Sequence, residues 1–196
     1  MTRTLAVAVG LTLLGLGSVQ PSSRLSAQTG AWTTLFDGTS LKGWNTIGNA
    51  NWAVADAAMQ ASSGTGFLVT PVPYGDFQIT LEFWVSEDAN SGVFLRCQDA
   101  ATISATNAYE VNVFDKRPDP TYGTGAIVNV AKPLSQMTTG GKWNTFDITA
   151  QGPKLTVILN GVKTVEVEDK KFARGPIGLQ YGAGTVKFRN VRIRTL

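Results

Sequence analysis

The sequence contains no histidine and only one cysteine among its 196 residues. Without histidine, a Ser-His-Asp or Cys-His triad, a histidine-ligated zinc site and an imidazole general base are all excluded. The single cysteine, Cys97, excludes an internal disulfide and a multi-cysteine metal cluster. Charged residues are also scarce, at 16% against about 25% in an average globular chain. We therefore expect carboxylates to carry any acid–base chemistry.

The N-terminal residues have the pattern of an export signal. An uncharged apolar run over residues 5–19 follows Arg3, and a polar stretch with small residues at Ser26 and Ala27 comes next. This order is typical of a secretory signal peptide over residues 1–27. The run is shorter than the ~20 residues of a membrane-spanning helix. We therefore expect a secreted or periplasmic protein with no membrane span after cleavage.

The positive charge belongs partly to this predicted leader. Removing residues 1–27 deletes Arg3 and Arg24 and no acidic residue, so the formal net charge falls from +3 to +1. A nearly neutral chain has no basic footprint for nucleic acid. The basic residues near the C-terminus are interpreted as the outward face of a final strand: Lys187, Arg189, Arg192 and Arg194.

The rest of the chain predicts an all-β domain over residues 35–196, after a short lead-in at 28–34. Residues 77–85 alternate between apolar and polar side chains, as a half-buried strand does. Residues 154–169 form a predicted hairpin, because Asn160-Gly161 tolerates the positive φ angles of a type I′ turn. Further predicted strands lie at 66–70, 92–97, 108–115, 124–130, 143–151, 176–181 and 185–194. About a dozen short strands favour a two-sheet antiparallel β-sandwich of the jelly-roll kind.

Strand alternation also predicts a binding surface. If the strands 77–85, 92–97 and 108–115 are neighbours, one outer face combines polar and aromatic side chains: Glu82, Arg96, Glu110 and Asn112 with Trp84, Phe94 and Phe114. Charged and amide groups beside aromatic rings suit a sugar, which offers hydroxyl groups and an apolar ring face. The alternative is a solvated face with ordinary cross-strand ion pairs.

Several sequence blocks resemble one known family. The segment 35–44 reads Leu-Phe-Asp-Gly-Thr-Ser-Leu-Lys-Gly-Trp, and Asn90-Ser-Gly-Val-Phe-Leu-Arg96, Tyr109-Glu-Val111 and Gly175-Pro-Ile-Gly-Leu-Gln180 follow in order. These blocks are similar to those of the 3-keto-disaccharide hydrolase domain family. The resemblance implies a concanavalin A-like sandwich and an exported enzyme that acts on glycosides already oxidised at C3 by a partner sugar 3-dehydrogenase.

The resemblance also implies a mechanism and a set of residues. A ketone at C3 acidifies the C2 proton, so a base can start elimination of the C1 substituent, and water then adds back. Glu110 is the expected base with Glu82 or Asp115 in reserve, and Arg96 is expected to stabilise the enolate. The expected substrate-binding residues are Trp84, Phe94, Asn112, Phe114, Asp115, Lys132 and Gln180. A divalent cation here would need oxygen ligands only, which favours Ca²⁺ or Mg²⁺.

One departure from the family pattern leaves the activity open. Related sequences often read Leu-Gln-Asp-His-Gly where this chain has Leu-Gln-Tyr-Gly-Ala-Gly at 179–184. The missing histidine gives weight to a non-catalytic carbohydrate-binding module. The sequence is also compatible with a conventional glycosidase, whose two carboxylates would lie ~5–5.5 Å or ~6.5–9.5 Å apart, and with a structural sandwich on the cell surface.

Overall fold

The computed structural model describes residues 1–2 and 30–196 of the chain. The predicted signal peptide and the first residues of the lead-in therefore lie outside the described residues. No helix in the described part has the length and apolar character that a membrane span requires. Its elements are thirteen β-strands and one short 3₁₀ helix, η1 (Pro120–Tyr122).

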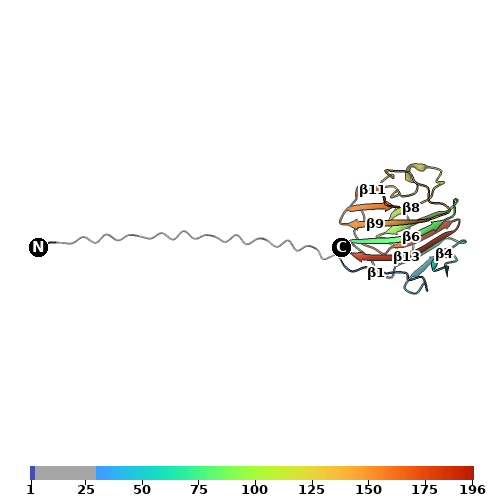
Figure 1. Ribbon diagram of the computed structural model, residues 1–196, viewed down its shortest axis with the longest axis horizontal. Coiled ribbons are helices and arrows are strands. Elements are labelled where there is room, and N and C mark those ends of the chain that lie inside the picture. The colour runs from blue at the N-terminus through green and yellow to red at the C-terminus, as the bar shows by residue number, and fades with distance from the viewer. Residues whose placement is uncertain (3–29) are drawn as a thin grey trace.

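The strands form two antiparallel sheets, which confirms the predicted two-sheet sandwich (Figure 1). In order across the sheet, the eight-stranded sheet A contains β11 (Val162–Glu168), β10 (Lys154–Leu159), β9 (Trp143–Gln151), β6 (Phe77–Val85), β13 (Val186–Thr195), β4 (Ala58–Ala61) and β3 (Ala53–Ala55), and β1 (Thr33–Thr34) also pairs with β13. The five-stranded sheet B has the order β2 (Asn45–Gly48), β5 (Gly66–Val69), β12 (Gly178–Ala183), β7 (Asn90–Leu95) and β8 (Tyr109–Val113).

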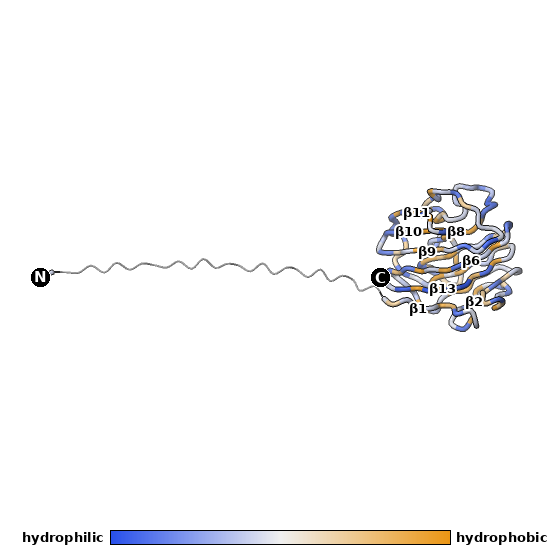
Figure 2. The backbone as a smooth tube through the Cα atoms, viewed as in Figure 1, coloured by the Kyte–Doolittle hydropathy of each residue, from blue (hydrophilic) through white to orange (hydrophobic). Residues whose placement is uncertain are grey.

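The core lies between the two sheets and follows the alternation of each strand. In β6 every second residue from Phe77 to Val85 is at most 1% exposed, while the residues between them are partly exposed. The same alternation is visible along the strands in the hydropathy colours of Figure 2. A strand buries one face because successive side chains point to opposite sides of the sheet.

Two local predictions have different outcomes. The β10–β11 hairpin turns at Asn160-Gly161 with φ angles of 51° and 80°, as a type I′ turn requires. The predicted strand 124–130 is not a regular strand. Its backbone bridges β8 at Ile127, and then Asn129, with a φ of 62°, turns the chain back so that Ile127 and Ala131 face each other.

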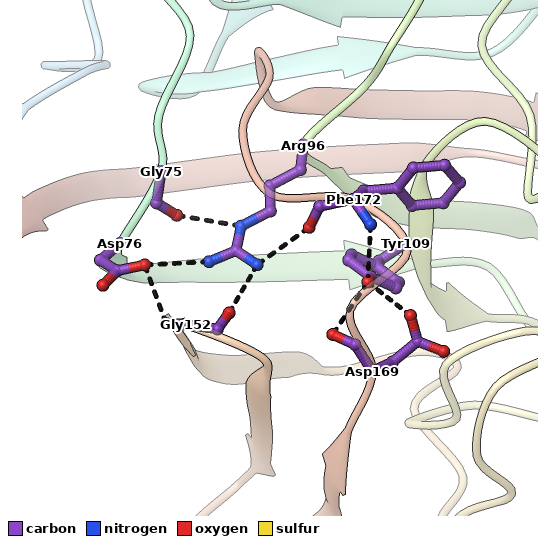
Figure 3. A network of polar contacts seen from close by, with 7 residues as sticks. All are labelled: Gly75, Asp76, Arg96, Tyr109, Gly152, Asp169 and Phe172. Carbon is purple, nitrogen blue, oxygen red and sulfur yellow. Dashed lines mark hydrogen bonds and ion pairs between the residues drawn. The ribbon is translucent and has the colours of Figure 1, made fainter.

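Arg96 does not point outward as alternation predicts. It follows β7 directly, and its φ of 53° breaks the strand pattern, so its side chain is 1% exposed inside the end of the sandwich. The guanidinium donates to three backbone carbonyls, those of Gly75, Gly152 and Phe172, at 2.9–3.0 Å (Figure 3). It also pairs with the Asp76 carboxylate at 3.2 Å.

A tyrosine completes this buried polar network. The Tyr109 hydroxyl donates to the Asp169 carboxylate at 2.7 Å and accepts from the Phe172 N–H at 3.0 Å (Figure 3). Burial and the bond to Asp169 raise the pKa of Tyr109 to about 12. Phe172 lies in the connection from β11 in sheet A to β12 in sheet B. The Arg96 network therefore joins one end of both sheets.

Replacing Arg96 with methionine is expected to lower the free energy of unfolding by about 3 kcal/mol, because one buried and two partly buried carbonyls lose charged donors that an apolar side chain cannot replace. Urea denaturation measures the change. Lys116→Met is the control: its partner Glu87 and Lys116 itself are 77% and 63% exposed, so its loss should change stability by less than ~1 kcal/mol. Equal losses in the two variants would contradict a structural role for Arg96.

Candidate functional site

The outer face of sheet B brings three of the predicted site residues together. Gln180 on β12 pairs with Gly92 on β7, and Gly92 pairs with Asn112 on β8, so the three lie in one row across the sheet. Glu110 occupies the next outward position of β8, opposite Phe94. The inward positions beside them, Val93 and Val111, are in the core. We call this set the Glu110 site: Glu110, Gly92, Asn112 and Gln180.

Two amide side chains at this site carry buried acceptors without partners. The Asn112 side-chain nitrogen donates to the Tyr122 carbonyl at 2.6 Å, but its Oδ1 has no hydrogen-bond partner among the described residues. The Oε1 atom of Gln180 is buried and equally unpaired. A buried unpaired acceptor costs about 1–3 kcal/mol, and such exceptions call for an explanation. Hydroxyl donors of a ligand would satisfy both oxygens.

Gly92 lies buried in the sheet between these two amides. A Cβ at this position would lie 3.1 Å from the Val111 carbonyl and 3.5 Å from Gln180 Oε1. A side chain here would therefore crowd the Val111 carbonyl and the Phe94 ring, which lies 3.3 Å from the same point, and would touch Gln180. Glycine lets a ligand approach the sheet backbone closely.

Glu110 has the properties of an acid–base group near neutral pH. Its side chain is half-buried, and burial raises its pKa to about 7, against which the positive charge of Arg117 acts. Its backbone is fixed on both sides, because β7 pairs with it and the Val128 N–H donates to its carbonyl at 3.0 Å. A carboxyl with this pKa can both remove and return a proton at pH 7.

A surface hollow of about 420 Å³ lies on the other side of Gln180. Strands β2, β5 and β12 and the loop at 101–103 surround it, and its lining includes Ile47, Phe67, Asn90, Ile103, Gln180 and Gly182. Gln180 therefore separates this hollow from the rest of the Glu110 site. The hollow provides room for a ligand group next to Gln180.

Phe94 is outward-facing but offers no face for sugar stacking. It is 1% exposed and packs against Phe67 with ring centroids 5.1 Å apart, in a small cluster with Cys97, Ile103 and Ala108. The loop that follows β7 covers it, which alternation along a strand cannot show. Cys97 in the same cluster is buried, and burial raises the pKa of its thiol to about 12, which leaves it unreactive.

The predicted outer surface that includes Glu82 and Trp84 is wrong, because β6 belongs to sheet A and β7 and β8 to sheet B. Glu82 and Trp84 thus lie on the opposite side of the sandwich from Glu110. Burial raises the pKa of Glu82, but hydrogen bonds from Asn190 at 2.6 Å and Arg189 at 2.8 Å outweigh this effect, so the pKa is lowered overall. The Trp84 ring lies under Lys187, at 5.4 Å from its centroid.

Arg96 is likewise separated from Glu110. The guanidinium is held by the carbonyls and the Asp76 carboxylate of the Arg96 network, so it is not available as a donor at the sheet surface. The expectation that it faces outward fails because of its positive φ.

The remaining predicted residues lie in the segment between β8 and β9, which extends beside β11 at one end of the sandwich (Figure 1). Asp115 anchors this segment: its carboxylate accepts from the Thr124 hydroxyl, from the N–H and hydroxyl of Thr139, and from the Gly140 N–H, at 2.6–3.0 Å. With four donors it is not a free base. Phe114 is half-buried at the start of the segment, and Lys132 is exposed after the turn at Asn129.

The residues described contain no cluster of the usual metal-ligating side chains. Among them, no three histidine, cysteine, aspartate or glutamate side chains cluster as ligands would. Ca²⁺ takes six to eight oxygen ligands, normally with several carboxylates, and the Glu110 site supplies one carboxylate and two amide oxygens. These side chains alone therefore do not supply the ligand set of a Ca²⁺ site.

Sequence reasoning missed Gly92 and Arg117. Gly92 is one of 21 glycines, and only the strand pairing shows that it lies between the two amides. Arg117 belongs to the 115–123 loop, which its proline and glycine content predicts as a connection that could overhang the site. Nothing in the sequence distinguishes Arg117 from its neighbour Lys116, which pairs with Glu87 at the surface.

Solved structures similar to this chain include two proteins of Parabacteroides distasonis described as candidate glycosyl hydrolases. One is 20% identical with a TM-score of 0.77, over 84% of this chain and 94% of that protein. The other is 25% identical with a TM-score of 0.72, over 85% of this chain and all of that protein. The carbohydrate-binding module CBM66 from Bacillus subtilis is 22% identical with a TM-score of 0.62, over 76% of this chain and 94% of the module.

A comparison with curated proteins gave no match. One family model matches residues 31–194, which is most of the chain. The matched residues include both sheets, the Arg96 network and the Glu110 site. The chain therefore belongs to the family of 3-keto-alpha-glucoside-1,2-lyase-like domains, a carbohydrate-related family with the sandwich fold described above.

Proposed function

We propose that the protein cleaves 3-keto-glycosides by elimination followed by hydration, with Glu110 as the general base. The observation that carries the proposal is a half-buried carboxyl with a pKa of about 7 on the outer side of sheet B, beside two unpaired amide oxygens. Membership of the 3-keto-alpha-glucoside-1,2-lyase-like family supports the substrate class.

The reaction requires only one base that changes its protonation state. The Glu110 carboxylate takes the C2 proton, and the electron pair of the C2–H bond moves toward the C3 oxygen. The pair then returns to form a C1=C2 double bond as the C1–O bond breaks, and the leaving oxygen takes a proton from Glu110 or water. Addition of water across C1 and C2 gives the free 3-keto sugar, so one water is consumed overall. A positioned base of this kind contributes about 10²–10⁴-fold to a rate.

The two amides orient the sugar ring. Their unpaired oxygens, Asn112 Oδ1 and Gln180 Oε1, accept hydrogen bonds from sugar hydroxyl groups, and Gly92 between them allows the ring to approach the backbone. The hollow beyond Gln180 receives the leaving group or a second sugar. Groups held on paired strands are well positioned for this, because the sheet restricts their backbone.

Two features of the biological setting belong to the same proposal. A glycoside must be oxidised at C3 before this reaction, so a sugar 3-dehydrogenase supplies the substrate. The signal-peptide pattern of residues 1–27 supports a secreted or periplasmic location.

A non-catalytic carbohydrate-binding module is the second candidate. Gly182 stands where the family pattern has histidine, and a Cβ there would lie 3.1 Å from the side-chain nitrogen of Asn90 and 2.9 Å from its carbonyl oxygen. Asn90 thus takes up the space of that missing side chain. The likeness to CBM66 in fold agrees with this candidate. Sugar binding without release of reducing sugar from any 3-keto disaccharide would favour it over the enzyme.

Glu110→Gln is expected to reduce kcat on a 3-keto disaccharide by at least about 10²-fold while KM changes little, because the amide keeps the shape and loses the base. Release of reducing sugar measures the rate. Glu166→Gln is the control, since Glu166 lies on β11 in sheet A and pairs with Lys163 and Lys154. Unchanged turnover by Glu110→Gln would remove Glu110 as the base.

The pH dependence of kcat/KM should follow the ionised fraction of Glu110. A base with a pKa of about 7 is protonated below that pH, so kcat/KM should fall about tenfold per unit on the acid side and level off above pH 7. A flat profile between pH 5 and 8 would argue against a base with a raised pKa.

Stability gives a test of the same carboxyl without turnover. The folded pKa lies above the ordinary value of 4.5, so Glu110 is neutral in both states below about pH 4.5. Between about pH 4.5 and 7 it ionises mainly in the unfolded state, so the folded state loses stability over this range, and the loss is complete above pH 7. Glu110→Gln should therefore be more stable than the wild type at pH 8, by up to about 3 kcal/mol, and equal to it at pH 4. Urea denaturation at both pH values would show the difference, and a gain that is equal at both would contradict the raised pKa.

A further inference from the structure

The proposed elimination lacks one group among those placed so far. Charge develops on the C3 oxygen when the C2 proton leaves, and such charge is normally met by a cation or by fixed donors. The sequence points to Arg96 for this role, but its guanidinium is enclosed by the carbonyls of the Arg96 network and Asp76. If the reaction proceeds through an enolate, another cation or hydrogen-bond donor must act at the Glu110 site.

Arg117 lies in the segment that borders this site. Tyr122, five residues further along the same loop, places its carbonyl on the Asn112 side chain at 2.6 Å, so the loop passes over the outer face of β8. Arg117 lines a cavity of about 220 Å³ with Asp115, Thr124 and Met137. The four hydrogen bonds to Asp115 fix the backbone two residues before Arg117.

The side chain of Arg117 lacks the bonds of a structural arginine. Its Nε is buried with no hydrogen-bond partner among the described residues, and none of the ion pairs formed in this part of the chain includes it. By contrast, Arg96 and Arg189 are both held by carboxylates. A buried guanidinium nitrogen without an acceptor is costly unless a ligand supplies one.

Its charge acts on the carboxyl of the site. Arg117 is near enough to Glu110 to lower the pKa that burial raises. The nearby Asp119 carboxylate is exposed and accepts from the Thr121 N–H at 3.0 Å, so it does not neutralise Arg117 by a direct bond. Base and cation thus come from different elements, β8 and the loop that follows it.

We propose that Arg117 binds the C3 oxygen of the 3-keto sugar and stabilises the enolate that forms when Glu110 takes the C2 proton. This inference rests on the proposed function. The guanidinium donates to the oxygen without giving up a proton, so the proton balance of the reaction is unchanged. Arginine suits the role because its charge persists at all relevant pH values and its planar donors remain fixed.

The test compares Arg117→Met, Arg117→Lys and Lys116→Met with the wild type on a 3-keto disaccharide. Arg117→Met should lower kcat by about 10²–10³-fold, as loss of an oxyanion donor does, and Arg117→Lys should retain part of the rate through its charge. Lys116→Met, in the adjacent exposed position, should keep the wild-type rate. Urea denaturation should show all three variants folded, because Arg117 makes no ion pair to lose.

A second readout separates this inference from the proposed function. NMR titration of the Glu110 carboxyl should give a higher pKa in Arg117→Met than in the wild type and no change in Lys116→Met, whether or not substrate is turned over. An active wild type with unchanged rate and Glu110 pKa in Arg117→Met would overturn the role of Arg117 alone. A wild type that releases no sugar would overturn the proposed function, and with it any role at C3.

Discussion

One buried guanidinium determines how the two sheets meet at one end. Arg96 follows β7 in sheet B, and its donors bind the chain just before β6 and the β9–β10 turn of sheet A, and the connection that returns to sheet B. Because three of its acceptors are backbone carbonyls, the interaction fixes main-chain positions and not only side chains. The approach is close: a Cβ on Gly175 would collide with the backbone of Arg96 and Cys97. The Arg96 network therefore fixes the ends of β7 and β8, the strands that carry Gly92, Glu110 and Asn112.

The Glu110 site differs from the Arg96 network because it contains polar atoms without hydrogen-bond partners, held on the rigid backbone of a sheet. The amide oxygens of Asn112 and Gln180 remain without donors, while Asp115 in the neighbouring segment has four. The carboxylate that shapes the loop thus has all its hydrogen bonds within the protein, whereas the amide oxygens on the outer side of sheet B have none. This contrast does not follow residue type, because an aspartate is the fully bonded group and the amides are the ones with unpaired oxygens.

Alternation along each strand is enough to predict the sandwich, the β10–β11 hairpin and the outward positions of Glu110 and Asn112. It cannot assign strands to sheets, so it groups Glu82 and Trp84 with residues on the far side of the molecule. It also cannot foresee that Arg96 leaves the strand pattern through a positive φ, or that a loop covers Phe94. These errors share a cause, since pairing partners, left-handed residues and loop paths depend on contacts between distant parts of the chain. Arg117 escapes prediction for the same reason.

The segment after β8 has a second effect through its backbone. Strand β8 is the last strand of sheet B, and residues 125–128 bond to it from outside: Gly125 and Val128 donate to the carbonyls of Asn112 and Glu110, and Asn112 donates to Ala126. An uncovered strand edge invites pairing with another chain. The loop that borders the Glu110 site therefore also protects this edge from pairing with another chain.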